Sequence, residues 1–100
     1  MKTISKAEIQ NRLGTNKEFL KSKFHVKEIG LFGSFVTGES TAASDIDILV
    51  EFQKGHKDFF NYMRLKLYLQ EILGRDVDLV PGSAVKPRLR KSIFSQVQYV

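Results

Sequence analysis

The chain has 100 residues, which is enough for one domain with a modest hydrophobic core but not for a second core, so we expect a single domain over residues 1–100. Hydrophobic residues make up 42% of the chain and charged residues 27%, as in soluble globular folds, and the absence of cysteine excludes a disulfide framework and a thiolate metal site. The net charge of +5 leaves a nucleic acid or an acidic protein surface to be considered as a partner.

Two short helices are predicted near the N-terminus. Residues 5–8 have the Ser-x-x-Glu form of a capping box, and the apolar residues that follow lie four apart, so a helix over about residues 5–13 is expected to end at Gly14. Residues 15–18 show a Thr-x-x-Glu pattern of the same kind and predict the start of a second helix. The apolar stripe of this second helix comprises Phe19, Leu20 and Phe24.

Two strands are predicted in the next part of the chain. Residues 26–32 are mostly apolar and end at a glycine, which is typical of a buried strand. Phe35 and Val36 should pack the following turn against the sheet. Residues 38–44 are small and polar and predict a loop, and residues 45–52 contain the longest apolar run, so they should form the central strand.

A longer helix is predicted over about residues 59–73, with Asp58 as its N-cap and Gly74 at its C-terminal end. Its apolar side chains form two rows. The first row comprises Phe59, Tyr62, Leu65, Leu69 and Ile72, and the neighbouring row comprises Phe60, Met63 and Leu67. So wide an apolar face leaves two interpretations open: both rows pack in the core, or one of them is a surface for a partner.

The C-terminal part of the chain predicts a third strand over residues 75–80 and a last helix over about residues 86–98. The inward-facing side chains of that helix should include Leu89, Ile93 and Phe94. Residues 86–91 hold the densest run of positive charge, which we interpret as the polar face of the helix, so direct nucleic-acid binding is not expected. No segment approaches the ~20 apolar residues of a membrane span, and we expect a cytoplasmic protein without membrane contact.

Two aspartates, Asp45 and Asp47, open the second strand one residue apart. Successive strand side chains point to opposite faces, so both carboxylates share one face while Ile46 and Ile48 take the other. Carboxylates held side by side repel each other, and a strand that enters a hydrophobic core is a costly place for them. A bound divalent cation would remove this conflict, so the pair predicts a metal site.

The Gly33-Ser34 corner at the end of the first strand predicts a phosphate site. Glycine lets the backbone approach a ligand closely, and the amides that open the following helical turn favour an anion, with the Ser34 hydroxyl as an added donor. Phosphate donors and a paired-carboxylate metal site would then face each other across one strand-turn-strand unit. Such a unit can handle a nucleoside triphosphate with magnesium.

These residues resemble a known family. Gly33-Ser34, followed after ten residues by Asp45-x-Asp47, is the signature of the DNA polymerase beta-like nucleotidyltransferase superfamily. The segments LFGSFVTGE, SDIDILVEF and VDLV look like its smallest branch, the minimal nucleotidyltransferases that pair with HEPN-domain toxins. The resemblance implies an α+β fold with a short mixed sheet of about three strands and flanking helices.

The resemblance also implies roles for individual residues. The third metal-site carboxylate of the family lies in the VDLV strand and maps onto Asp78. Asp45, Asp47 and Asp78 would hold two Mg²⁺ ions and carry catalysis, and Gly33 and Ser34 would bind the β- and γ-phosphates of ATP. The implied reaction is transfer of AMP to a tyrosine hydroxyl of a partner HEPN toxin. Because this modification silences the toxin, the protein resembles an antitoxin.

One departure from the family pattern concerns Thr37. The family usually reads Gly-Ser-x-x-Arg-Gly, and Thr37 stands where the arginine is expected. An arginine there would be well placed to contact phosphate, so its absence puts nucleotide affinity in question while the carboxylates are intact. The alternative function is a catalytically weak binding module that neutralises its toxin by covering it, although the three retained aspartates favour the enzyme.

Overall fold

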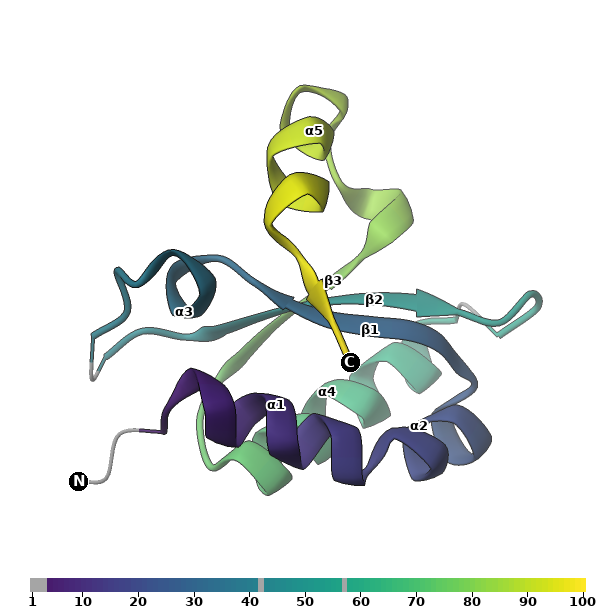
Figure 1. The fold of residues 1–100 in the computed structure, drawn as a ribbon. Coiled ribbons are helices and arrows are strands. Elements are labelled where there is room, and N and C mark those ends of the chain that lie inside the picture. Colours follow the sequence, from purple (N-terminus) through teal and green to yellow (C-terminus); the bar gives the residue numbers. More distant parts are fainter. Residues whose placement is uncertain (1–3, 42, 57) are drawn as a thin grey trace.

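The computed structural model describes residues 4–41, 43–56 and 58–100. Its centre is a four-stranded sheet with the strand order β3-β2-β1-β4 (Figure 1). The strands are β1 (Val26–Phe32), β2 (Ile46–Phe52), β3 (Val77–Pro81) and β4 (Gln98–Tyr99). β1 runs antiparallel to both β2 and β4, whereas β3 runs parallel to β2. The predicted α+β fold with a mixed sheet is confirmed, but the sheet has four strands where about three were expected.

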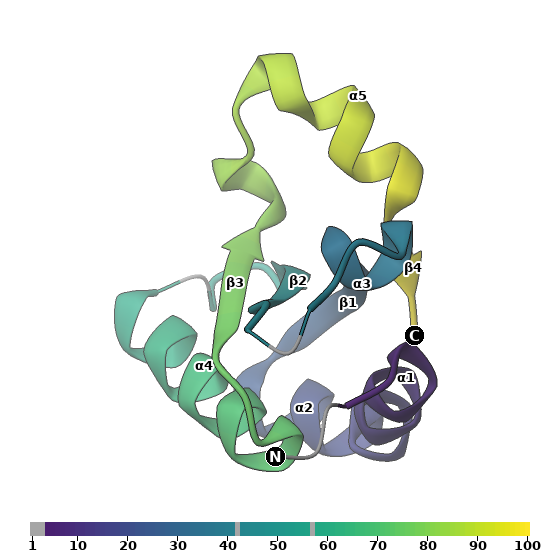
Figure 2. The ribbon, with the colours of Figure 1, turned by 90° about the vertical axis from the view of Figure 1, so that its left-hand side faces the viewer.

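Helices lie on both faces of this sheet. One face is covered by α1 (Lys6–Thr15), α2 (Lys17–Phe24) and α4 (Phe59–Leu73), which lie below the sheet in Figure 1. The other face carries α5 (Pro87–Gln96), which the 3-10 helix η1 (Gly82–Ala84) connects to β3 (Figure 2). The short helix α3 (Ser34–Thr37) follows β1 at one end of the sheet.

β2 alternates between two hydrophobic clusters. Its side chains on the face of α1, α2 and α4 are fully buried in the main core, namely Ile46, Ile48 and Val50. Leu49 points to the opposite face and forms a smaller cluster with Phe32 and Val85, against which Ile93 and Phe94 of α5 pack. β2 is therefore one of the two interior strands of the sheet, as its apolar run predicted, and both of its faces are covered.

The structure confirms Ser5 as the N-cap predicted for the first helix and corrects the cap predicted for the second. The Ser5 hydroxyl accepts a hydrogen bond at 3.1 Å from the backbone amide three residues further on. Gly14 does not end α1, which continues to Thr15. The Thr15 hydroxyl donates to the carbonyl of Asn11 instead of capping the next helix, since a hydroxyl in a helical turn can bond the carbonyl four residues back. α2 accordingly begins one residue later than a Thr15 cap would place it.

α4 has the limits that were predicted, but its two apolar rows differ in burial. Leu65 and Leu69 of the first row are fully buried. Phe59 is 68% exposed, so the interpretation in which both rows pack entirely in the core does not hold; its ring lies edge-on against that of Phe60 at the start of the helix, with centroids 5.9 Å apart. In the second row Phe60 is 72% and Leu67 58% exposed. The core therefore uses the first row from Tyr62 onward, whereas Phe60 and Leu67 of the second row stay at the surface.

The C-terminal segment differs from the prediction. The last helix ends at Gln96, and the short strand β4 then pairs with Gly30 and Leu31 of β1. A Cβ atom at Gly30 would lie 2.8 Å from a methyl group of Val97, so the chain can return this closely only because residue 30 is a glycine. Leu89 was expected to face inward but is 42% exposed, because α5 contacts the sheet through residues nearer its C-terminal end. Among the described residues, we find no helix that is long and apolar enough to cross a membrane.

Candidate functional site

Two of the three candidate carboxylates lie side by side on the face of the sheet that carries α5. β2 and β3 are parallel neighbours, and Asp47 is paired with Asp78 in their register. Asp47 alternates with Leu49 of the smaller cluster, so its side chain shares the face of α5. Asp45 lies just before β2 and is exposed, as is Asp78, whereas Asp47 is half-buried. The sheet register thus brings two acidic side chains together from separate parts of the sequence.

The Asp47 carboxyl has its pKa raised from 3.8 to about 6. Burial is the largest cause, and the negative charge of Asp78 is the next. A hydrogen bond from the Ser34 backbone amide acts in the opposite direction and lowers the pKa, while the charge of Asp45 raises it further. This end of the sheet therefore concentrates negative charge that a cation would relieve.

The glycine-serine corner packs directly against Asp47. Gly33 has φ 78° and ψ −150°, a conformation that only glycine adopts readily. A Cβ atom at this position would lie 2.1 Å from Oδ2 of Asp47, so no side chain fits there. The Gly33 carbonyl accepts hydrogen bonds from the amides of Val36 and Thr37, which starts α3. Within the described part of the chain, no hydrogen bond engages the Ser34 hydroxyl, which leaves it able to donate to a ligand.

Gln96 supports this corner and was missed by reasoning from the sequence. It lies at the C-terminal end of α5, and its Oε1 accepts a hydrogen bond from the Gly33 amide at 3.0 Å. No sequence pattern links these residues, because the contact depends on how β4 returns α5 to β1.

Arg75 supports the loop that leads into Asp45 and was also missed. It precedes β3 and donates hydrogen bonds to the backbone carbonyls of Thr41 and Ser44. Its guanidinium carbon lies 5.6 Å from the centre of the Phe35 ring of α3, which is a cation–π distance. One arginine therefore connects the start of β3, the loop before Asp45 and the turn after the glycine-serine corner.

The carboxylate pair fits a magnesium ion. Among the described residues, no three His, Cys, Asp or Glu side chains form a ready-made metal cluster. Magnesium does not need one, since proteins usually hold it through one or two carboxylates together with the phosphates of a substrate. Asp47 and Asp78 are such a pair, and the raised pKa of Asp47 indicates that a nearby cation would be favourable. Asp45 lies near enough for its charge to act on Asp47.

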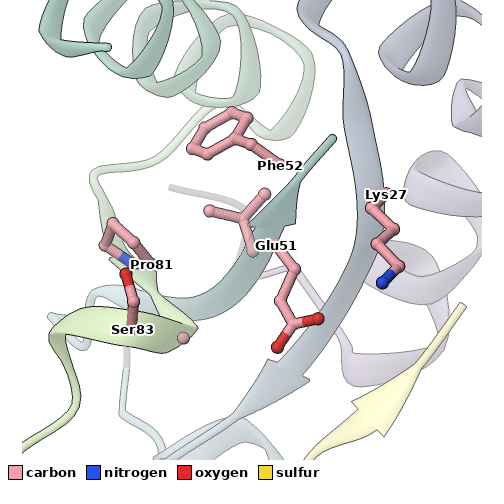
Figure 3. Close-up of a pocket in the computed structure, with 7 residues that line it drawn as sticks. Lys27, Glu51, Phe52, Pro81 and Ser83 are labelled. Atoms are coloured by element: carbon pink, nitrogen blue, oxygen red, sulfur yellow. The ribbon is translucent and has the colours of Figure 1, made fainter. Parts of the chain in front are cut away.

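A separate hollow lies at the other end of β2, away from the aspartates. Its volume is about 180 Å³, and Lys27, Glu51, Pro81 and Ser83 are among the residues that line it (Figure 3). Lys27 and Glu51 extend into it from neighbouring strands, and among the described residues no ion pair joins them. The Gly82-Ser83 turn of η1 also lines the hollow, but Glu51 is the one carboxylate among the lining residues. The hollow therefore lacks the paired carboxylates, and the chemistry predicted above belongs to the aspartate end of the sheet.

Comparison with known protein families gives a match over most of the chain. Residues 14–100 match the family described as nucleotidyltransferase domain. The chain is also similar to protein adenylyltransferase MntA of Thermococcus cleftensis, with 39% identity over 100 residues and full coverage of both chains. The matched ranges include the glycine-serine corner and all three candidate carboxylates.

Solved structures resemble this fold over most of its length. A protein assigned as a minimal nucleotidyltransferase has a TM-score of 0.83 at 28% identity, covering 98% of each chain. A toxin-antitoxin complex with AMP-PNP contains a chain with a TM-score of 0.68 at 28% identity, covering 85% of this chain and 69% of that chain. A complex of a tri-AMPylated HEPN toxin of Shewanella oneidensis with an MNT antitoxin gives a TM-score of 0.65 at 25% identity, covering 91% and 70%. The similarity therefore extends well beyond the short motif.

Proposed function

The chain belongs to the nucleotidyltransferase domain family and to its minimal branch, and on this basis we propose that it transfers AMP from ATP to a tyrosine hydroxyl of a HEPN-domain toxin and so acts as an antitoxin. Two relatives support the proposal. MntA is named a protein adenylyltransferase, and a related solved complex pairs an AMPylated HEPN toxin with an MNT antitoxin. ATP as the donor is supported by a third relative, a toxin-antitoxin complex with the ATP analogue AMP-PNP.

The main support within this chain is the pairing of Asp47 with Asp78 directly beside Gly33. In the proposed reaction the acceptor oxygen bonds to the α-phosphorus of ATP while the bond from that phosphorus to pyrophosphate breaks. The hydroxyl proton passes to a carboxylate, a role that we assign to the exposed Asp78. Such a displacement depends on positioning and charge stabilisation rather than on a covalent protein intermediate.

The remaining site residues bind the nucleotide in this proposal. Gly33 and Ser34 hold the β- and γ-phosphates, with the free Ser34 hydroxyl as a charge-assisted donor. Asp45, Asp47 and Asp78 would hold two Mg²⁺ ions, and the bound ions would supply positive charge to neutralise the phosphate oxygens. The half-buried Asp47 lies between Gly33 and Asp78, so it connects the proposed phosphate-binding corner with the second carboxylate.

Transfer of label from ATP tests the proposal. The protein is incubated with magnesium, ATP labelled at the α-phosphate and a purified HEPN partner, and we expect label on the partner. Asp47→Asn and Asp78→Asn should abolish the labelling. Asp76→Asn is the matched control, because it removes an exposed carboxylate from the same segment without touching the pair. Equal labelling in all four proteins would remove the site assignment.

A binding antitoxin without catalysis is the second candidate function. Thr37, exposed in α3, is the observation that favours it, because an arginine at that position could contact phosphate. Toxin neutralisation separates the two candidates. If Asp47→Asn protects cells from the toxin as well as the unchanged protein does, complex formation suffices; if protection is lost while the complex still forms, catalysis is required.

A further inference from the structure

We propose that Gln96 is a positioning residue for the nucleotide-binding corner, an inference that rests on the proposed function. Gln96 is the last residue of α5 and is half-buried. Its Oε1 atom lies 3.0 Å from the Gly33 backbone nitrogen, in a partly buried hydrogen bond between residues 63 positions apart. Gln96 does not need to touch ATP in this role, because it acts through Gly33.

The hydrogen bond matters because the backbone of Gly33 has little steric restraint of its own. Glycine populates many conformations, and the one observed, with φ 78° and ψ −150°, must be held by its contacts. Three hydrogen bonds among the described residues hold it: the Gly33 carbonyl accepts from Val36 at 2.9 Å and from Thr37 at 3.0 Å, and the Gly33 amide donates to Gln96. Gln96 is therefore the one side chain among these three contacts.

The next peptide group carries this restraint to the acidic pair. Oδ2 of Asp47 packs against Gly33, and the Ser34 amide lowers the pKa of the same carboxyl, so the direction of the Gly33-Ser34 peptide sets this contact. The same peptide sets the place of the Ser34 hydroxyl, the proposed phosphate donor. A short chain of contacts thus runs from Gln96 through Gly33 and Ser34 to Asp47.

The fold explains why Gln96 can serve in this way. α5 has no fully buried residue, and its C-terminal end is secured where Val97 joins the smaller cluster and Gln98 pairs with Leu31 of β1. Gln96 immediately precedes this anchor. Its amide oxygen is consequently presented to the end of β1, where Gly33 begins the turn.

The test compares Gln96→Leu with Gln98→Leu. Leucine has a similar size and no acceptor, and Gln98 is a matched control because its Oε1 accepts one hydrogen bond, from Gln10 at 2.8 Å, that ties β4 to α1 rather than to the corner. We measure the dissociation constant of Mg-ATP by calorimetry, kcat and KM for ATP, and the free energy of unfolding in urea. Gln96→Leu should weaken Mg-ATP binding and lower kcat/KM about tenfold, as loss of an orienting outer hydrogen bond does elsewhere, with unfolding like that of Gln98→Leu.

Conservative variants exclude a purely structural effect. Gln96→Glu keeps an acceptor oxygen and should bind Mg-ATP more tightly than Gln96→Leu does. If Gln96→Leu does not fold, Gln96→Asn replaces it in the same comparison. The asparagine side chain is shorter by one methylene group, so its oxygen lies farther from the Gly33 amide. Mg-ATP affinity and kcat/KM equal to those of Gln98→Leu would overturn the inference.

The outcome also separates this inference from the proposed function. A protein that binds Mg-ATP but labels no HEPN partner would contradict the transfer reaction, and the affinity of Gln96→Leu relative to Gln98→Leu would still decide the role of Gln96. A protein that binds no Mg-ATP would overturn both.

Discussion

Replacement of Asp47 by asparagine is expected to stabilise the magnesium-free protein at neutral pH. The pKa of this carboxyl is raised from 3.8 to about 6, first by burial and then by the charge of Asp78. Above pH 6 the Asp47 carboxyl is therefore mostly ionised in the folded chain, in surroundings that disfavour its negative charge. Asparagine has nearly the same shape, keeps an oxygen that can accept from the Ser34 amide, and carries no charge.

The size of the effect follows from the raised pKa of Asp47. A tenfold change in an acid dissociation constant corresponds to about 1.4 kcal/mol, so a rise in pKa from 3.8 to about 6 would give roughly 3 kcal/mol for a fully buried group. Asp47 is half-buried, and solvent screening reduces the interaction, so we expect about 1–2 kcal/mol. That is a measurable part of the stability of a small domain.

The sign of the pH dependence distinguishes this cause from others. Because its pKa is higher in the folded state, Asp47 holds its proton more tightly when folded, so its contribution to stability is present below about pH 4 and is lost as the pH rises through about 6. Asparagine does not ionise, so Asp47→Asn does not lose this stability as the pH rises. The difference in free energy of unfolding between the two proteins should therefore grow in favour of the variant from pH 4 to pH 7.

Urea unfolding at several pH values, in the presence of a chelator, measures this difference. Asp76→Asn is the control, because Asp76 is exposed and is not among the groups that raise the pKa of Asp47. Parallel stability curves for the unchanged protein and Asp47→Asn between pH 4 and pH 7 would refute the reasoning, since they would mean that neither burial nor the charge of Asp78 disfavours the ionised form of Asp47 in the folded state.

Further predictions concern the corner and the metal. Gly33→Ala should cost about 1–3 kcal/mol in urea unfolding, because its Cβ would collide with Asp47 Oδ2, and it should abolish AMP transfer; normal stability would contradict the observed contact. Ser34→Ala should weaken Mg-ATP binding by about 1.5–3 kcal/mol in calorimetry, with the exposed Ser22→Ala as control, and unchanged affinity would place the phosphates elsewhere. Mg-ATP at 100 times its dissociation constant should stabilise the unchanged protein by about 2.7 kcal/mol but not Asp47→Asn, as followed by thermal unfolding. Thr37→Arg should change AMP transfer little, and a variant that gains transfer from an inactive parent would instead indicate a decayed enzyme.

Local features of the fold could be predicted because their causes are local. The limits of α4 follow from an acidic N-cap and a glycine in the left-handed conformation at its end, both of which lie within a few residues of the helix. Thr15 shows where this reasoning fails, because its hydroxyl can either cap the helix that follows or donate to a carbonyl of the preceding turn. β4 has only two residues and no pattern of its own, so its pairing depended on Gly30 in a distant strand.

Burial was harder to predict than helix position. Periodicity assigned Phe59 and Leu65 to the same row of α4, yet one is 68% exposed and the other fully buried. Periodicity in the sequence indicates which side chains share one face of a helix, but not which part of that face is covered by the sheet. For the same reason the inward orientation predicted for Leu89 on α5 was wrong.

The amino-acid sequence by itself predicted the glycine-serine corner and the aspartates Asp45 and Asp47 as candidates, because residues that are adjacent or alternate in a strand share their surroundings whatever the rest of the chain does; in the structure Asp47 lies in β2 and Asp45 just before it. It assigned Asp78 only through resemblance to a family, and it contained no sign of Gln96 or Arg75. Those three residues reach the site through sheet register, the return of α5 and the packing of the loop before Asp45. Such contacts join distant segments, so their geometry is decided by the packing of the whole chain and cannot be read from spacing.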